Sequence, residues 1–252
     1  SLDTPLLGIN LYGDCCQSEL DDLFDACRVA GVQVGIDITS SHDTVPRLDR
    51  VLDRLDLVRV SLYSLDKERN DAWWCDNPHA SVLLVTEWLA GKTVGKVLLV
   101  PVDEHNVHEL PALADFALSH GFSFNPLFVP GLLAGAGNSA YDSTIACIVE
   151  LHSHHQDAVY IDFPCAYRDF GKSARCVALW LAADIDWDGS VRGCQFSRRS
   201  VGTIGDLVRV WQSHSGEETW PAACMHCDDK AACGGGCLVL REEVGHDPFC
   251  PR

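Results

Sequence analysis

The sequence lacks an apolar run of about 18 residues, the minimum for a helix that crosses a bilayer, and its opening segment Ser1–Pro5 is neither basic nor apolar as a signal peptide would be. We therefore expect a cytoplasmic protein without a membrane partner. Basic residues are also few, with 19 Lys and Arg against 36 Asp and Glu and a net charge of −17. Nucleic-acid binding is not expected, because contacts to phosphates need clustered basic side chains.

Cysteine, by contrast, is abundant, with 13 residues in a chain of 252. A secreted disulfide scaffold is usually short and rich in cysteine throughout, whereas here most cysteines lie in the last third of the chain. In a reducing compartment, such a cluster indicates metal ligation. The eight clustered cysteines are Cys165, Cys176, Cys194, Cys224, Cys227, Cys233, Cys237 and Cys250.

Residues 5–164 alternate between short apolar runs and amphipathic helical stretches. This alternation predicts an α/β fold with a parallel sheet or barrel, and six strands fall short of the eight in a complete barrel. One predicted helix has Pro111 in its first turn and ends at Gly121. The predicted strands are 6–11, 32–38, 57–62, 94–102, 122–129 and 158–163, and the predicted helices are 18–31, 45–55, 81–89, 109–121 and 141–152.

The composition of the sequence changes after Pro164: Gly and Cys become frequent, and helical periodicity is lost. Only Asp206–Trp211 then resembles a short helix, and Asp186–Ser190 predicts a hairpin turn of the Asp-Gly kind. We therefore predict two domains, a partial (β/α) barrel over 1–164 and a small cysteine-rich domain over 165–252.

The spacing of the cysteines suits a metal site. Thiolates are soft, negatively charged donors, and four of them can surround a tetrahedral metal or an iron–sulfur cluster. Two residues between cysteines allow one tight turn to direct both sulfur atoms at one centre, and the Gly234–Gly236 run allows the backbone to pass close to it. The pattern is Cys176-x12-Gly189-x4-Cys194, then Cys224-x2-Cys227-x5-Cys233-x3-Cys237, then Cys250.

This pattern resembles the SPASM domain, the auxiliary iron–sulfur module of many radical S-adenosylmethionine (SAM) enzymes, at all seven of its cysteine positions. The resemblance implies two [4Fe–4S] clusters. One would be held by Cys224, Cys227, Cys233 and Cys250, and the other by Cys176, Cys194 and Cys237 with Cys165 as the candidate fourth ligand. Zinc remains an alternative, since four thiolates around zinc would also stabilise a small domain.

Residues 5–164 resemble the later part of a radical SAM partial barrel. Gly8–Asp14 corresponds to the strand and Gly-Gly-Glu-Pro end that receive the amino group of SAM, although only Gly13 and Asp14 match. Val58–Leu62 is similar to the segment that ends in Ser-Leu-Asp-Gly, which places Ser61 near the SAM ribose. By this resemblance Asp14 and Ser61 are the candidate cofactor-binding residues, and Tyr63 and Ser64 depart from the motif.

The Cys-x3-Cys-x2-Cys motif that holds the SAM-cleaving cluster of the family is not in this sequence, where Cys15 and Cys16 are adjacent and Cys27 follows on a helix. Two explanations remain open, a chain that starts after this motif or a relative that has lost it. We expect this chain alone not to cleave SAM, and the sequence identifies no catalytic residue.

The resemblance implies a radical SAM/SPASM oxidoreductase that modifies a peptide or protein by hydrogen abstraction, with a third cluster that binds SAM and a possible electron-donor protein. The alternative is a non-catalytic module that binds metal and either binds a peptide or relays electrons. Neither the substrate nor the oligomeric state can be derived from the sequence.

Overall fold

The chain forms two compact units, which we describe separately. Residues 4–127 and 146–162 make up the first, here called the α/β unit, and residues 1–3, 128–145 and 163–252 make up the second unit. The predicted domain boundary near residue 164 stays a prediction. The computed structural model describes residues 8–12, 21–38, 44–130, 138–160, 183–186, 188–206, 209, 222–228, 235–237, 239–241 and 250.

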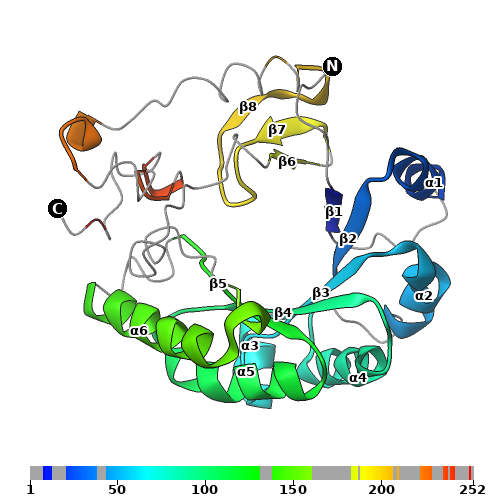
Figure 1. Cartoon of the computed structure of the whole chain (residues 1–252), viewed down its shortest axis with the longest axis horizontal. Coiled ribbons are helices and arrows are strands. Elements are labelled where there is room, and N and C mark those ends of the chain that lie inside the picture. Colours follow the sequence, from blue (N-terminus) through cyan, green and yellow to red (C-terminus); the bar gives the residue numbers. More distant parts are fainter. Residues whose placement is uncertain are drawn as a thin grey trace. The chain divides into compact units, whose positions relative to one another are not determined.

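The α/β unit is built on a parallel five-stranded sheet with its strands in sequential order (Figure 1). Most strands alternate apolar and more polar residues, which places the apolar residues on one face of the sheet. A single parallel bridge between Phe124 and Val159 marks the place of the sixth predicted strand, whose residues 161–163 lie outside the described part of the chain. The strands are β1 (Gly8–Tyr12), β2 (Gln33–Ile38), β3 (Leu57–Ser61), β4 (Gly95–Pro101) and β5 (Ser123–Leu127).

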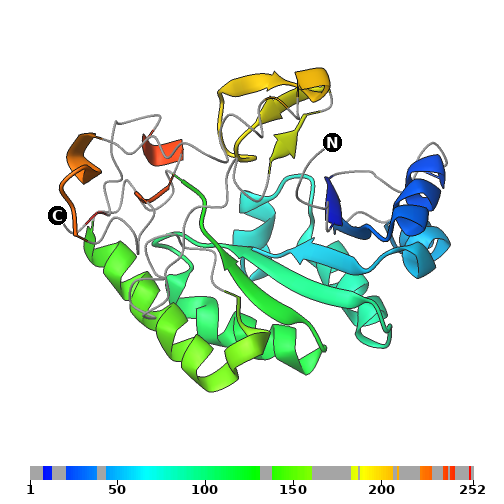
Figure 2. The same ribbon diagram turned by 45° about the horizontal axis from the view of Figure 1, so that its top comes forward.

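Helices cover one face of this sheet, as Figures 1 and 2 show for α1, α2, α4 and α5. The sequential order and the crossover helices confirm the predicted α/β partial barrel. The helices are α1 (Asp21–Ala30), α2 (Thr44–Val51), α3 (Lys67–Trp73), α4 (His79–Ala90), α5 (Leu110–Ser119) and α6 (Asn138–His155), with 3-10 turns η2 (Leu52–Arg54), η3 (Val107–Glu109) and η4 (Gln156–Ala158).

Local sequence signals account for several helix ends. Pro111 lies in the first turn of α5, where its missing N–H costs nothing. Gly121 follows α5 with φ +74°, and Gly31 follows α1 with φ +68°, both in the left-handed region that glycine adopts without strain. The sequence did not predict α3, which begins after Asp66, whose carboxylate accepts a hydrogen bond from the Arg69 N–H.

The core lies between the sheet and these helices. On β2 and β3 the residues that face the helices are fully buried, namely Ile36, Val58 and Val60 at 0% exposed area. The helices contribute Leu48 from α2, Leu89 from α4 and Leu113 from α5, whose exposed area is also 0%. They supply the apolar side chains on the helix side of the core. Burial of such side chains supplies the main stabilising free energy of the unit. None of the helices that the structure describes is long and apolar enough to cross a membrane.

The second unit contains an antiparallel sheet of β6 (Asp184–Ile185), β7 (Ser190–Arg192) and β8 (Ser200–Thr203). The predicted Asp-Gly turn joins β6 to β7: the Gly189 N–H donates to the Asp186 carbonyl over 2.9 Å, and Gly189 has φ +81°. The predicted helix over 206–211 lies largely outside the described residues, which show a 3-10 turn η6 at Ile204–Asp206 and one helical residue at Arg209. A further 3-10 turn, η7, spans Ala222–Cys224.

Gly95 at the start of β4 gives a test of this packing. A Cβ atom there would lie 2.8 Å from the Asp56 carbonyl oxygen, which is backbone and cannot move aside cheaply. We expect Gly95→Ala to lower the free energy of unfolding by about 1–3 kcal/mol in urea denaturation. Gly91→Ala is the control, because Gly91 has φ −84° and an added Cβ would meet nothing within 4 Å. It should change stability by less than about 1 kcal/mol, and equal losses in both variants would contradict the packing described.

Candidate functional site

Several polar side chains lie opposite the helices, on the inner face of the sheet, beside apolar residues such as Val97 and Leu99 of β4. Strand register places Tyr12 beside Asp37 and Asp37 beside Arg59, so these side chains lie on one face of three neighbouring strands. Interior layers of (β/α) barrels are usually filled by branched apolar side chains, and polar residues at these positions therefore require an explanation. We call Asn10, Tyr12, Asp37, Arg59, Ser61 and Asn125 the inner cluster.

An ion pair links the centre of the inner cluster. The Arg59 Nε–H donates to Asp37 Oδ1, and the side chains are only 24% and 16% exposed. Burial raises the pKa of Asp37, and the positive charge of Arg59 opposes this shift. The Arg59 guanidinium carbon also lies 5.9 Å from the centre of the Tyr12 ring, within reach of a cation–π contact.

Two asparagines of the inner cluster carry buried polar atoms without hydrogen-bond partners. These atoms are Oδ1 and Nδ2 of Asn10 and Oδ1 of Asn125. The Asn10 amide is close enough to Asp37 to lower the pKa of that carboxyl, but not in hydrogen-bonding geometry with it. Gly35 provides the space, since a Cβ there would lie 2.5 Å from Asn10 Oδ1. Each buried unsatisfied polar group costs about 1–3 kcal/mol, a cost that a bound polar ligand would remove.

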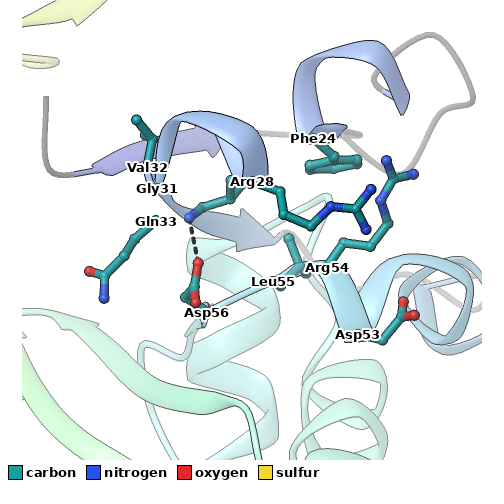
Figure 3. Close-up of a pocket in the computed structure, with 10 residues that line it drawn as sticks. Phe24, Arg28, Gly31, Val32, Gln33, Asp53, Arg54, Leu55 and Asp56 are labelled. Carbon is teal, nitrogen blue, oxygen red and sulfur yellow. Dashed lines mark hydrogen bonds between the residues drawn. The ribbon is translucent and has the colours of Figure 1, made fainter. Parts of the chain in front are cut away.

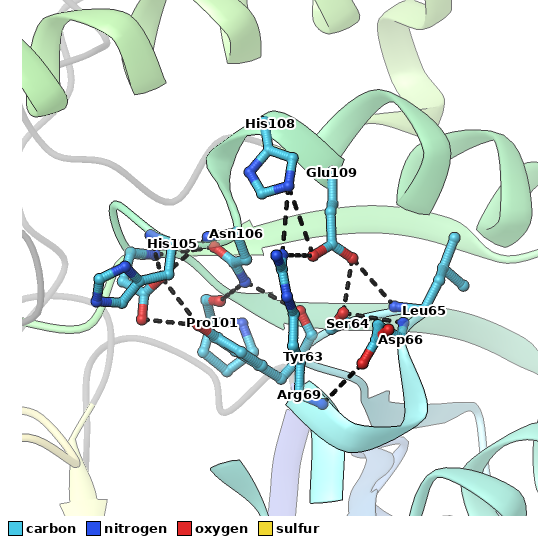
Figure 4. A network of polar contacts seen from close by, with 11 residues as sticks. Tyr63, Ser64, Leu65, Asp66, Arg69, Pro101, His105, Asn106, His108 and Glu109 are labelled. Atoms are coloured by element: carbon cyan, nitrogen blue, oxygen red, sulfur yellow. Dashed lines mark hydrogen bonds and ion pairs between the residues drawn. The ribbon is translucent and has the colours of Figure 1, made fainter. Parts of the chain in front are cut away.

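A second, fully buried network joins the loops that follow β3 and β4 (Figure 4). The Tyr63 hydroxyl donates to Asp103 Oδ2 over 2.9 Å, and the same carboxylate accepts the backbone N–H groups of His105 and Asn106. The Asn106 amide then donates to the carbonyls of Tyr63 and Pro101 over 2.9 and 2.8 Å. Desolvation and the Asp103 carboxylate raise the pKa of Tyr63, so the phenol stays protonated as a donor.

The same loops are held by Glu109 at the start of α5. Its carboxylate accepts from Ser64 Oγ over 2.6 Å and pairs with Arg69 over 2.7 Å. Tyr63 stacks on Trp73 of α3 with ring centres 4.3 Å apart and an angle of 4°. The two positions that depart from the family motif, Tyr63 and Ser64, therefore form the centre of this loop network.

The structure places Ser61 at the carboxyl end of β3, where its carbonyl accepts a hydrogen bond from the Asn77 side chain over 2.8 Å. Asn77 is itself bound through its carbonyl to Asn70, which holds the Tyr63 N–H. The backbone of Ser61 is thus held by a hydrogen bond, and its side chain lies on the inner face of the sheet. Asp14, the other candidate cofactor-binding residue, lies outside the described residues.

The predicted metal ligands are described only in part. Cys224 and Cys227 share one turn, in which the Cys227 N–H donates to the Cys224 carbonyl over 3.1 Å. Cys237 is 6% exposed and follows Gly235 and Gly236, both with positive φ. Cys194 and Cys250 are described and, like these three, form no disulfide, and the described part of the chain contains no group of three metal-binding side chains. Cys165, Cys176 and Cys233 lie outside it.

A pocket of about 350 Å³ lies at the amino-terminal ends of β2 and β3 (Figure 3). Three of the charged groups in its wall, Arg28, Arg54 and Asp56, have partners within the chain. Arg54 contacts Asp21 and Asp25 and lies over the Phe24 ring at 4.9 Å, and Asp56 accepts the Val34 N–H over 2.8 Å. With these three charged groups satisfied within the chain, the pocket gives a weaker indication of a ligand than the unpartnered atoms of the inner cluster do.

The sequence alone did not identify Arg59, Asn10 or Asn125 as site residues. The available signal was a charged or amide side chain inside an otherwise apolar strand. Which of these side chains meet one another depends on strand register, which the sequence pattern does not give.

Comparison with known proteins agrees with the fold. No protein-family model matches the sequence, and no curated protein is similar to it. Streptococcus suis SuiB bound to S-adenosylmethionine matches 97% of this chain with 14% identity and a TM-score of 0.69. SuiB bound to the precursor peptide SuiA is 15% identical to this chain, with a TM-score of 0.68. AnSMEcpe bound to AdoMet and the Cp18Cys peptide is 15% identical over 92% of this chain, with a TM-score of 0.65.

These neighbours were solved with S-adenosylmethionine and with peptides, and this chain shares their fold. The matches span 65–66% of SuiB and 76% of anSMEcpe, so this chain corresponds to about two thirds of SuiB. At 14–15% sequence identity, the structural similarity to these proteins establishes the fold of this chain.

The loop network gives a test of its own. Tyr63→Phe removes one donor to the buried Asp103 carboxylate, and we expect a loss of about 1–3 kcal/mol in the free energy of unfolding. Tyr160→Phe is the matched control, because Tyr160 is 48% exposed, and it should change stability by less than about 0.5 kcal/mol. Both are measured by urea denaturation, and a Tyr63→Phe variant as stable as the control would show that the hydrogen bond contributes nothing.

Proposed function

We propose that this protein is a radical SAM enzyme, or a large part of one, that modifies a peptide or protein substrate. The observation that carries the proposal is the sequential parallel sheet with a polar inner face, in a fold shared with enzymes solved with SAM and with peptides. Ligands of parallel α/β folds bind at the carboxyl ends of the strands. Tyr12 and Ser61 are the last residues of β1 and β3, and Arg59 lies at the centre of β3.

The residues present fit a polar cofactor in the α/β unit. Asn10 and Asn125 offer buried polar atoms that lack partners, and Arg59 lies on β3, between their two strands and on the same face. Ser61, assigned to the SAM ribose by the family resemblance, lies at the end of β3 on this face. SAM, when reduced by an iron–sulfur cluster, supplies the radical that abstracts hydrogen from the substrate. The loop network keeps the strand ends in place around it.

In the second unit we propose two auxiliary [4Fe–4S] clusters on the eight clustered cysteines. The shared turn of Cys224 and Cys227 and the positive φ of Gly235 and Gly236 beside Cys237 support a site that the backbone approaches closely. Cytoplasmic location, which would keep these thiols reduced, is part of the same proposal. A structural zinc site is the alternative that the same thiolates allow.

A second candidate function is a metal-binding module that does not cleave SAM. The observation that favours it is the sequence itself, in which no Cys-x3-Cys-x2-Cys motif occurs. Such a module would bind a peptide or relay electrons with its metal sites intact.

Metal analysis tests the cluster assignment. After anaerobic purification we expect about eight iron and eight sulfide per chain with broad absorbance near 400 nm. Cys227→Ala should remove about half of the iron and destabilise the second unit, because metal binding there contributes to folding. Cys75→Ala is the control, since Cys75 is exposed and outside the cysteine pattern, and it should leave the iron content unchanged.

Two results would contradict this assignment. Loss of iron in Cys75→Ala would show that the ligands are assigned wrongly. One or two zinc ions in a colourless protein would make the metal structural and favour the non-catalytic module.

Binding of SAM separates the enzyme from the module. We expect calorimetry on the full-length protein to detect SAM binding at micromolar to millimolar concentrations, because the inner cluster leaves polar groups available for it. Absence of binding, in a protein that holds its iron, would favour the module.

A further inference from the structure

A buried nitrogen of Arg192, in the second unit, lacks a hydrogen-bond partner among the residues that the structure describes. Arg192 is the last residue of β7, and its side chain is 24% exposed. One terminal nitrogen lies 2.9 Å from Asp184 and 3.1 Å from Asp186, and the other donates to the Ser197 carbonyl over 3.4 Å. Only the buried Nε is left without an acceptor. Buried N–H groups are nearly always hydrogen-bonded, so this one requires an explanation.

Two carboxylates hold the guanidinium in place. Asp184 and Arg192 lie directly opposite each other in the antiparallel pair of β6 and β7 (Figure 1). The Asp186 N–H donates to the Ser190 carbonyl over 2.9 Å, which continues this pairing beyond β6. Since Asp186 follows two residues after Asp184, the three charged side chains lie on one face of the hairpin. Charge-assisted hydrogen bonds to both carboxylates fix the orientation of the guanidinium.

The same guanidinium contacts the turn that begins at Cys194. The Ser197 N–H donates to the Cys194 carbonyl over 2.9 Å, which closes a turn of four residues, and the Ser197 carbonyl accepts from Arg192. Ser197 is 2% exposed, so the turn and the guanidinium meet at a buried residue. Cys194 follows Arg192 by two residues in the chain and is one of the cysteines that the family pattern assigns to an iron–sulfur cluster.

We propose that the Arg192 Nε–H donates a hydrogen bond to a sulfur atom of the iron–sulfur cluster at Cys194 and thereby raises the reduction potential of that cluster. The inference rests on the auxiliary clusters proposed above and deepens that proposal, because it names a residue that sets the potential of one of them. The acceptor is the Cys194 thiolate or an inorganic sulfide of the cluster, and both are negatively charged. Arg192 is a second partner of the cluster and not a ligand to iron.

Both the hydrogen bond and the positive charge of Arg192 favour the reduced cluster. One-electron reduction adds a negative charge to the cluster, so an N–H donor and a cation beside it stabilise the reduced form more than the oxidised form. The chain has a net charge of −17, which opposes the addition of an electron. One guanidinium faces the carboxylates of Asp184 and Asp186, so its removal would leave both negative charges uncompensated. Loss of Arg192 should therefore lower the potential.

An ion pair that only stabilises the hairpin explains less of what is observed. The contacts with Asp184 and Asp186 occupy one terminal nitrogen and need nothing from Nε. A buried donor without an acceptor destabilises the folded state, and a sulfur acceptor would remove that cost. A lysine at position 192 would also neutralise carboxylates, but it lacks the rigid fork that directs one N–H away from them.

Potentiometry followed by EPR tests the inference on the full-length protein, purified anaerobically with its iron. Dithionite supplies the electron, and the potential of each cluster is read from its reduced signal. Arg192→Gln should lower the equilibrium constant for reduction of one cluster about tenfold or more, which corresponds to about 59 mV for one electron. The other cluster should be unchanged. Arg192→Lys keeps the charge and should recover only part of the shift.

Arg199→Gln is the matched control. Arg199 lies in the same unit, carries the same charge and is exposed. Because water and salt screen an exposed charge, both potentials should remain those of the unmutated protein.

A measurement on the unmutated protein keeps the test decisive where Arg192→Gln loses its cluster. ENDOR spectra of reduced protein grown with arginine that carries the heavy nitrogen isotope at Nε should show coupling between this nitrogen and a cluster. The coupling should disappear in Arg192→Lys. Absence of coupling in the unmutated protein overturns the inference.

The outcomes separate this inference from the proposed function. Iron and sulfide at the expected content, with both potentials unchanged in Arg192→Gln, overturn the role of Arg192 and leave the clusters standing. An equal shift in Arg199→Gln shows a general effect of charge and also overturns that role. A colourless zinc protein overturns both the clusters and the role of Arg192. A shift confined to one cluster, in a protein that does not bind SAM, supports the role of Arg192 and overturns the enzyme.

Discussion

The structure of the α/β unit depends on one constraint, that successive side chains of a strand point to opposite faces of the sheet. On β2 and β3 this alternation sends Ile36, Val58 and Val60 into the core beneath the helices, and Asp37 and Arg59 to the inner face. A shift of one residue in register would bury the ion pair among apolar side chains and expose the core. The same pairing that stabilises the fold therefore also assembles the candidate site.

The loops after β3 and β4 are ordered by a second principle, the complete satisfaction of buried polar groups. Asp103 is 4% exposed and receives three donors, and Asn106 at 1% uses both its carbonyl and its amide. A fully satisfied buried network specifies one conformation. The inner cluster differs, because buried polar atoms of Asn10 and Asn125 have no hydrogen-bond partner.

Much of the fold could be predicted from the sequence, because helix ends and turns are local. Pro111, Gly121 and the Asp186–Ser190 turn behave as their residue types require. Side-chain contacts between strands could not be predicted, since they depend on register. Tyr63 is the clearest example: by motif it is a departure, and in the structure its hydroxyl and ring join β3, β4 and α3. The cysteine ligands stay predictions, as Cys165, Cys176 and Cys233 lie outside the described residues.

The sequential strand order has a consequence for assembly. Each described strand from β1 to β5 hydrogen-bonds only to the strands immediately before and after it in the chain. Each of these strands pairs with a strand that is close to it in the sequence. The entropic cost of closing each connection is therefore that of one crossover segment. A chain of this kind can build its sheet vectorially as it leaves the ribosome, each new strand adding to a template that already exists.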